Sequence, residues 1–343
     1  MATIKHALHS AIHNALVRRR GRAIDKALAA KFEQRCKTLG VRATWEDYVR
    51  ARAQISCNLD EYFAFEFYEH KDTELRDSFM TMDRQSAIVR KIGDVDQAMT
   101  ILGSKLLFDD HFDAFLKREW INPTAASAQQ FTAFLQKHGR VIVKPATLCS
   151  GKGITAHNYQ GEEDALRLYD ELYGSGAVVE QMLVQHEDMN RLNPHCVNSV
   201  RVLTYTDRDE VHILLATART GAGDGIVDNF GAGGLSMAVD WKSGAIIADG
   251  IDQDFRRVAK HPLTGTQIKG FQIPNWDKAI DIVERAARLA YTLPQCRWIG
   301  WDLAFLADGD VAIIEGNWRP GTLAQNTHPR GIYHELKELS KKL

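Results

Sequence analysis

The residues best suited to chemistry lie near the C-terminus, in the stretch WIGWDLAFLADGDVAIIEGNWRPG over residues 298–321. Two apolar runs flank Asp308 and Gly309, and such a pair between alternating hydrophobic residues is a strong signal for a β-hairpin. A two-residue turn there would place Asp302 directly opposite Glu315, with both carboxylates on one face. The opposite face would take Trp301, Leu303, Phe305, Ala312 and Ile314, leaving Gly300, Ala304 and Ile313 beside the acids.

Two directly opposed carboxylates repel each other, and a divalent cation between them would remove the conflict. Asn317 follows on the same face and completes an all-oxygen set suited to Mg²⁺, which usually keeps phosphates as its remaining ligands. Arg319 comes next and could reach the same anions or a carboxylate substrate. The alternative is an ordinary surface hairpin whose acids lie in solvent.

A second motif is VIVKPATLCSGKGI, which reads as a β-branched strand followed by a glycine-rich loop. Backbone N–H groups of such a loop can hold phosphate oxygens, and Lys144 and Lys152 add positive charge. The loop residues are Ser150, Gly151, Lys152 and Gly153. No GK[ST] sequence opens a helix here, so the motif is not a Walker loop, and a plain hairpin loop with exposed lysines is the alternative.

Further candidates lie between these motifs. A buried strand ends at Glu180, and the connector after it could bind a base edge through its backbone, while Glu187 could accept from sugar hydroxyls. A core strand with an exposed acid is the alternative. Arg201 lies inside the alternating strand NSVRVLTYT, where a bound phosphate or a protein carboxylate would serve as its partner. The glycines near Asn229 permit close approach to a ligand, or form a surface loop.

The composition indicates a soluble globular protein. The chain has 343 residues, 45% of them hydrophobic and 25% charged, with a net charge of -1. This balance argues against a general role on nucleic acids or membrane surfaces, which usually need a basic excess. No apolar run approaches the roughly 20 residues that span a bilayer, and no apolar signal core is visible, so we expect a cytoplasmic location. The five cysteines include no CxxC pair and are expected to be reduced thiols; Cys149 is a spectator or, less simply, a catalytic thiol.

Hydrophobic periodicity predicts the elements that position these residues. The first 104 residues read as mainly helical, with many aromatic side chains over 45–68 that we interpret as packing. Helices are predicted over residues 104–116, 161–173, 277–293 and 334–343, and the last is expected to be solvated. The irregular stretch 250–276 could form a lid or substrate loop. Its His261 could act as a base, although a loop histidine is more often structural.

Read together, Lys105, the VIVKP strand with its SGKG loop, VVEQML, NSVRV and the DLAF…IIEGN hairpin resemble the ATP-grasp superfamily over residues 105–321. The phrases NSVRVLTY, NFGAGGLSMAVD, HPLTG and IGWDLAF…IEGNWRPG are most similar to its sugar-transfer-associated branch, relatives of the alpha-L-glutamate ligases. This resemblance implies an α+β ATP-grasp fold in which two α/β subdomains, 105–183 and 184–343, clasp ATP. A mainly helical region, 1–104, precedes them.

The resemblance also implies roles for individual residues. Phosphates of ATP would be bound by Lys105, Lys144 and the loop Ser150, Gly151, Lys152 and Gly153. The adenine would meet Glu180 and the backbone from Gln181 to Leu183, and Glu187 would bind the ribose. Two Mg²⁺ ions would be held by Asp302, Glu315 and Asn317. Arg201 and Arg319 would steady the transferred phosphoryl group.

The function implied is an ATP-dependent carboxylate-amine ligase that forms an amide through an acyl phosphate and releases ADP and phosphate. Its partners would be a small-molecule carboxylate and an amine, and the substrate could be a sugar-linked compound or an amino acid. Two alternatives remain open: a small-molecule phosphotransferase, and a non-catalytic ATP-binding accessory protein of polysaccharide biosynthesis. The sequence contains no Ser-His-Asp or Cys-His arrangement, and phosphoryl transfer needs none.

Overall fold

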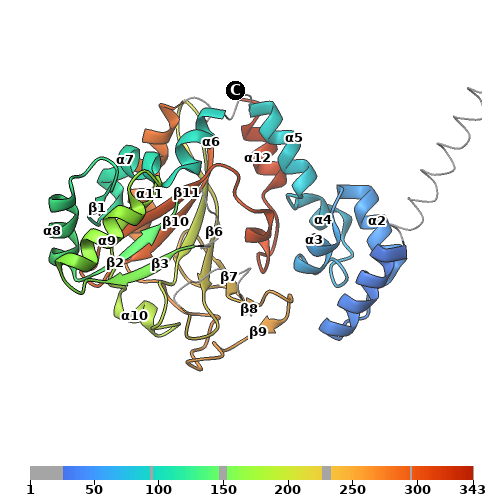
Figure 1. Cartoon of the computed structure of the whole chain (residues 1–343). Helices are drawn as coiled ribbons and strands as arrows, with labels where there is room; N and C mark the ends of the chain where they lie inside the picture. The colour runs from blue at the N-terminus through green and yellow to red at the C-terminus, as the bar shows by residue number, and fades with distance from the viewer. Residues whose placement is uncertain (1–25, 93–95, 147–152, 226–232, 294–295, 343) are drawn as a thin grey trace, which may run out of the picture.

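The structure is a computed structural model that describes residues 26–92, 96–146, 153–225, 233–293 and 296–342. The N-terminal helices lie at one end of the molecule and a small sheet at the other, with a large sheet between them (Figure 1). The predicted loop residues Ser150, Gly151 and Lys152, together with Cys149 and Asn229, lie outside the described residues.

The part of the predicted helical region that the structure describes, residues 26–92 and 96–104, is mainly helical and is built around aromatic side chains; residues 1–25 lie outside the described residues. A helix over residues 26–39 is followed by α2 (Trp45–Ile55), α3 (Leu59–Ala64), α4 (Thr73–Ser78), α5 (Met82–Ile92) and α6 (Asp96–Gly103). The side chains of Thr44, Asn58 and Asp72 cap α2, α3 and α4, because each accepts a bond from an otherwise unpaired N–H group. The buried aromatic core contains Phe32, Tyr48, Tyr62, Phe63, Phe65, Phe67 and Phe79.

A small antiparallel sheet carries the VIVKP motif. Its strand order is β1-β4-β2-β3, formed by β1 (Trp120–Ile121), β2 (Arg140–Lys144), β3 (Thr155–Asn158) and β4 (Val178–Gln181). The helices α8 (Ala128–His138) and α9 (Glu162–Leu172) pack against it through one hydrophobic core. Both contain apolar residues at helical spacing, which explains why each buries a single face.

The large sheet is antiparallel and carries the acid hairpin at one edge. Its order is β11-β10-β5-β6-β7-β8-β9. The strands are β5 (Val200–Thr206), β6 (Val211–Thr220), β7 (Leu235–Val239), β8 (Gly250–Ile251), β9 (Arg257–Val258), β10 (Trp298–Phe305) and β11 (Val311–Asn317). A short helix, α10 (Glu187–Asn190), lies between the two sheets in sequence.

Helices cover both faces of the large sheet. On one face, α7 (Lys105–Leu116) and α11 (Trp276–Tyr291) share a core with β10 and β11. On the other face, α5 and α12 (Tyr333–Leu339) pack against Leu203 and Tyr205. The expectation that the C-terminal helix is solvated is therefore wrong, because Leu336 and Leu339 are buried against the sheet. The stretch 250–276 is also packed, since Ile268, Phe271 and Ile273 belong to the core.

The hairpin exists, but its turn differs from the prediction. Leu306 N–H donates to Asp310 O at 2.9 Å, so the loop has three residues and ends at Gly309, whose φ is 80°. Such a loop ends in a left-handed residue, which glycine adopts without strain. It shifts the pairing by one position, so that Phe305 faces Val311.

A bulge at Ile314 reverses that shift. Leu303 pairs with Ile313, whereas Asp302 pairs with Glu315, so one extra residue lies on β11. The predicted pairing of the two acids is correct although the predicted turn is wrong, because the two irregularities cancel. The predicted faces change accordingly: Ile313 joins the Trp301 core, whereas Ala312 and Ile314 lie with Ala304 on the acid side.

Candidate active site

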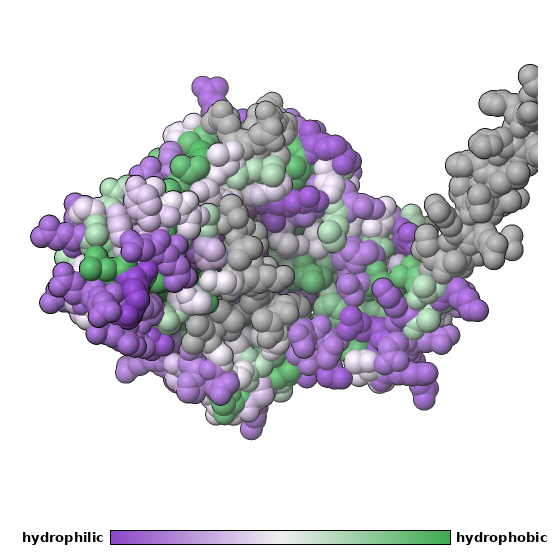
Figure 2. Space-filling view, in the orientation of Figure 1, coloured by the Kyte–Doolittle hydropathy of each residue, from purple (hydrophilic) through white to green (hydrophobic). Residues whose placement is uncertain are grey.

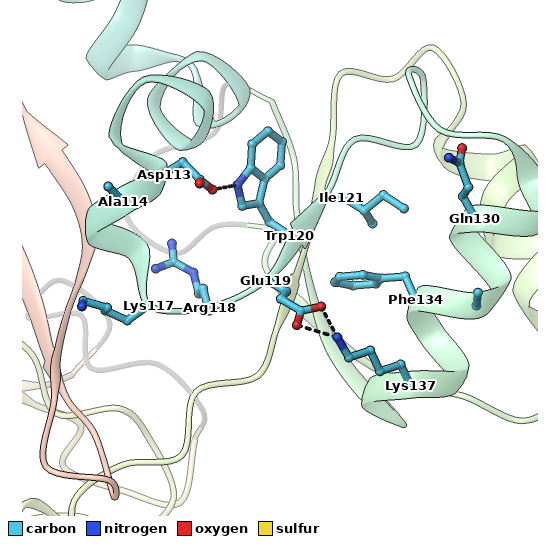
Figure 3. Close-up of a pocket in the computed structure, with 11 residues that line it drawn as sticks. Asp113, Ala114, Lys117, Arg118, Glu119, Trp120, Ile121, Gln130, Phe134 and Lys137 are labelled. Carbon is cyan, nitrogen blue, oxygen red and sulfur yellow. Dashed lines mark hydrogen bonds and ion pairs between the residues drawn. The ribbon is translucent and has the colours of Figure 1, made fainter.

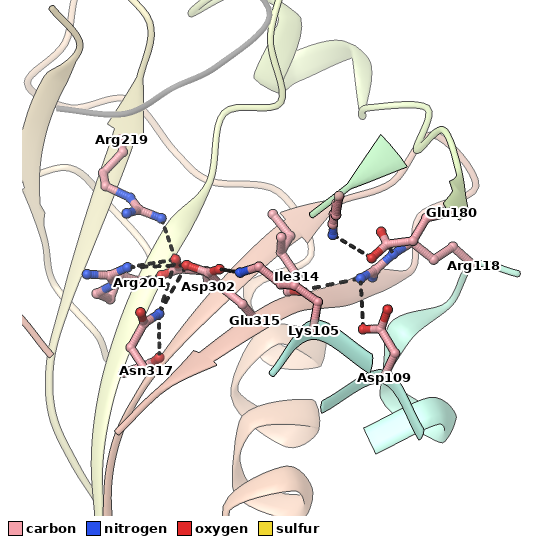
Figure 4. Close-up of polar contacts among 12 residues, drawn as sticks. Lys105, Asp109, Arg118, Glu180, Arg201, Arg219, Asp302, Ile314, Glu315 and Asn317 are labelled. Carbon is pink, nitrogen blue, oxygen red and sulfur yellow. Dashed lines mark hydrogen bonds and ion pairs between the residues drawn. The ribbon is translucent and has the colours of Figure 1, made fainter. Parts of the chain in front are cut away.

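The acids of the hairpin form an ion-pair cluster with three cationic side chains (Figure 4). Asp302 is 2% exposed, and Arg201 binds it with both ends of its fork, at 2.6 Å and 2.7 Å. Arg219 Nη2 lies 2.7 Å from Asp302 Oδ2. Glu315 lies on the neighbouring strand β11, and Lys105 Nζ, at the start of α7, lies 2.8 Å from its Oε2. Three cations thus offset the repulsion between two opposed carboxylates.

Backbone geometry explains how Arg201 reaches the acids. Arg201 on β5 pairs directly with Asp302 on β10, so their side chains leave the same face of the sheet. A Cβ on Gly300 would lie 3.3 Å from Arg201 Cδ and 2.9 Å from Pro320 Cβ. Glycine at this position therefore makes room for the arginine stem.

The pKa of Glu315 lies well below its usual range. Burial of the carboxyl acts to raise the pKa, but Lys105, and more weakly Arg201, lower it further than burial raises it. Glu315 is consequently ionised at neutral pH and can act as an anionic ligand.

The donor set fits Mg²⁺. Asn317 Nδ2 lies 3.3 Å from Glu315 Oε1 and 3.5 Å from Asp302 Oδ2, so the amide touches both carboxylates. Asn317 makes both contacts through its amide nitrogen, so it would have to turn its Oδ1 towards a cation to complete an all-oxygen set. Such a set of two carboxylates and one amide leaves positions for phosphate oxygens. No group of three His, Cys, Asp or Glu side chains suited to a metal occurs within the described part of the chain.

A second cluster is buried between the two sheets. Lys144 Nζ lies 2.6 Å from Glu180 Oε1, and Arg118 Nε donates to Glu180 Oε2. Arg118 Nη2 lies 3.8 Å from Asp109 Oδ1. Burial would raise the pKa of Glu180, but Arg118 and Lys144 lower it below its usual range. Burial and the Glu180 charge raise the pKa of Asp109, so this carboxyl resists ionisation.

The remaining predicted nucleotide residues are spread around these clusters. Gln181 is half-buried at the end of β4, and Leu183 packs beside Ala304 and Leu306. Glu187 is exposed at the start of α10. Gly153 has a φ of 73°, a left-handed conformation that suits glycine.

Arg319 does not join the acid cluster in this structure. It is exposed, and it donates to Ser86 Oγ at 2.7 Å and to Gln85 Oε1 at 3.4 Å, both on α5. His261 is buried with Nε2 2.9 Å from Gly221 O, and burial lowers the pKa of its ring. These contacts give His261 a structural role in holding the loop after β6.

Sequence reasoning missed Arg219, Arg118 and Asp109. Arg219 could have been found, because it lies in the strand HILLATART, and an arginine within a strand needs an anionic partner just as Arg201 does. Arg118 and Asp109 carry no comparable signal. Their partners come from distant strands, and no spacing rule brings them together.

A groove lies beside the second cluster. It encloses about 600 Å³ between α7 and α8 and includes Trp120, Phe134 and Lys137 (Figure 3). Glu119 and Lys137 form an ion pair across it. Arg118 borders it, but none of the predicted ATP or metal ligands does.

No helix among the described residues is long and apolar enough to cross a membrane. The surface over the small sheet and its helices is mainly hydrophilic with small apolar spots (Figure 2).

The model of a family described as sugar-transfer associated ATP-grasp matches residues 100–341. The chain belongs to this family, and its two antiparallel sheets form the ATP-grasp fold. No curated protein matches the sequence.

Several solved structures resemble the chain at low identity. D-alanyl-alanine synthetase A from Vibrio cholerae is 14% identical, with 71% of this chain and 66% of that chain covered and a TM-score of 0.42. N5-carboxyaminoimidazole synthase from Aspergillus clavatus is 12% identical, with 69% of this chain and 52% of that chain covered and a TM-score of 0.42. D-cycloserine synthetase is 16% identical, with 76% and 80% covered and a TM-score of 0.43. The chain thus spans only 66% and 52% of the first two proteins.

Proposed function

We propose that the protein is an ATP-dependent carboxylate-amine ligase. The observation that carries the proposal is the meeting of Asp302, Glu315 and Asn317 with Lys105 and Arg201 on one face of the large sheet. Family membership supports it independently. The family description also suggests a sugar-linked substrate, such as a uronic acid joined to an amino compound.

The proposed reaction has two steps. The substrate carboxylate attacks the γ-phosphorus of ATP, the bond to the bridging oxygen breaks, and ADP leaves with the electron pair. The amine nitrogen then attacks the carbonyl carbon of the acyl phosphate, phosphate leaves, and the nitrogen loses a proton to the solvent. The product is an amide.

The chain's own residues supply binding and charge. Mg²⁺, held by Asp302, Glu315 and Asn317, would neutralise phosphate charge when bound. Lys105 and Lys144 bind phosphate oxygens, and Arg201 faces charge that develops on the transferred group. Because Lys105 and Arg201 are already paired with Glu315 and Asp302, they are positioned before the nucleotide arrives.

Phosphorus NMR of the protein with Mg-ATP and a mixed pool of amino acids and uronic acids tests the proposal. We expect ADP and free phosphate to form only when both an acid and an amine are present. A phosphorylated small molecule without free phosphate would instead identify a phosphotransferase. ATP left intact in a pool that contains the substrate would identify a binding protein.

The variant Glu315→Gln makes this test specific for the metal site. It keeps the shape of the side chain but removes the charge, so we expect turnover to be lost. Glu163→Gln on the exposed face of α9 is the matched control and should retain full activity. Unchanged turnover in Glu315→Gln would refute the metal assignment.

A further inference from the structure

Arg118 occupies the short connection between α7 and β1, and its side chain is 1% exposed. The guanidinium group donates to Glu180 Oε2, to Leu116 O at 3.1 Å and to Ile313 O at 2.8 Å. A weaker bond reaches Ile314 O at 3.4 Å. One buried cation therefore contacts both the small sheet and the acid hairpin (Figure 4).

The contacts to the hairpin fall on its bulge. A bulge interrupts the regular ladder, so carbonyl groups beside it need donors from elsewhere. Arg118 supplies those donors at Ile313 and Ile314, the two residues just before Glu315. The bulge matters because a slip of one residue would turn Glu315 to the opposite face of the strand.

The Nε atom of Arg118 contacts Glu180, which pairs with Lys144, a proposed phosphate ligand. Glu180 accepts from Arg118 through one oxygen and pairs with Lys144 through the other. Arg118 therefore connects Lys144, the proposed phosphate ligand, to Glu315, the proposed metal ligand. The connection runs through the Glu180 carboxylate on one side and through the backbone of Ile313 and Ile314 on the other.

We propose that Arg118 is a positioning residue that holds the Ile314 bulge and thereby aims Glu315 at the metal. This inference rests on the proposed function of the acid pair. A lysine cannot replace Arg118, because an ammonium group lacks the planar fork that reaches a carboxylate and two carbonyls together. The sequence of the hairpin does not by itself indicate that an arginine at position 118 is needed.

Metal binding, measured without turnover, tests the proposal. Mn²⁺ is titrated into the protein in the presence of ADP, and bound Mn²⁺ is determined by electron paramagnetic resonance. Loss of a group hydrogen-bonded to a metal ligand costs about 10–100-fold in metal affinity. Because Arg118 acts on Glu315 through the backbone, we expect Arg118→Lys to bind Mn²⁺ more weakly by about tenfold, the lower end of that range. Arg285→Lys on the exposed side of α11 is the matched control and should bind normally.

Deletion of Ile314 separates positioning from general stability. Without the extra residue, an uninterrupted ladder would still pair Leu303 with Ile313 and Asp302 with Glu315. The deletion should therefore retain metal binding, and in combination with Arg118→Lys it should restore most of the affinity lost in the single variant. A residue that only neutralised buried charge would not be rescued in this way.

The outcomes distinguish the two proposals. If the unmodified protein binds no Mn²⁺ in the presence of ADP, the proposed metal site is wrong, and the proposed role of Arg118 is wrong as well. If the unmodified protein binds and Arg118→Lys binds equally well, only the positioning role is overturned. Equally weak binding by Arg118→Lys with and without Ile314 also overturns it. Thermal unfolding of each variant establishes that the titrated protein is folded.

Discussion

Asp302 and Glu315 face each other across two strands, and Arg201 pairs with Asp302 and also lies 3.9 Å from Glu315 Oε1. Asp302 is bound by Arg201 and Arg219, while Glu315 is bound by Lys105. These ion pairs hold the two carboxylates close together, and Lys105 keeps the pKa of Glu315 below its usual range. A cation that binds the acids must therefore compete with the guanidinium groups, which can then turn towards phosphate or substrate oxygens.

The depressed pKa of Glu315 leads to a prediction at the residue scale. Because the pKa is lowered, the Glu315 carboxylate stays ionised as the pH falls through the ordinary carboxyl range. Its ion pairs are lost only when the pH falls through the lower pKa of the folded protein. We expect no protonation of Glu315 between pH 7 and 5. Carbon-13 NMR of the side-chain carboxyls, assigned with Glu315→Gln, measures it.

Lys105→Met should raise the pKa of Glu315, because Lys105 is the cation that lowers it most. Its carboxyl signal should then titrate at a higher pH than in the unmodified protein. Lys117→Met is the control, since Lys117 pairs with Asp310 and not with Glu315. An identical Glu315 titration in Lys105→Met would contradict this account.

At the scale of single elements, the buried carboxylate of Asp47 connects the N-terminal helices. Asp47 Oδ2 accepts from Tyr62 at 2.8 Å, Lys71 at 2.9 Å and Arg76 at 2.7 Å. Burial of Asp47 acts to raise its pKa, but Arg76, Lys71 and Tyr62 bring it down to about 2. These bonds tie α2 to α3 and α4.

We expect this carboxylate to contribute about 2 kcal/mol to the free energy of unfolding, from the difference between its ordinary and folded pKa values. Because the pKa is lowered, the contribution is present above about pH 4 and is lost as the pH falls towards about 2. Asp47→Asn should therefore be less stable than the unmodified protein at pH 7. The difference in their free energies of unfolding should become smaller as the pH is lowered. Urea unfolding at several pH values measures this difference, with exposed Asp281→Asn as control.

At the scale of the whole molecule, the N-terminal helices are tied to the segment that follows the acid hairpin. Gln325, in the turn η2 (Thr322–Gln325), accepts from Met80 N–H at 2.9 Å and from Ile332 N–H at 3.0 Å. Its amide nitrogen donates to Met80 O at 2.8 Å and to Thr322 O at 3.0 Å. The helical region thus forms part of the structure around the site.

Gln325→Glu tests this connection with almost no change in shape. The ionised carboxylate keeps the two acceptors but loses both donors and introduces a buried charge. We expect a loss of about 2 kcal/mol or more in the free energy of unfolding by urea. Gln267→Glu, at an exposed bond to Ala259 O, should change stability little. Equal stability of the two variants would argue against a connecting role for Gln325.

The sequence by itself determined what depends on local pattern. Alternation and the Asp-Gly signal predicted the hairpin, helical periodicity predicted α7, α9 and α11, and the order of motifs identified the ATP-grasp family. Even the pairing of Asp302 with Glu315 followed from counting residues, although the count was right only because the three-residue loop and the Ile314 bulge compensate.

Only the tertiary structure decided which side chains meet. Arg118, Glu180 and the carbonyls of Ile313 and Ile314 come from separate parts of the chain, so their bonds follow from the packing of the two sheets. The same packing put Arg219 on Asp302 and buried the C-terminal helix against the large sheet. A periodic pattern reports which face of an element is apolar; it does not report which distant group will cover that face.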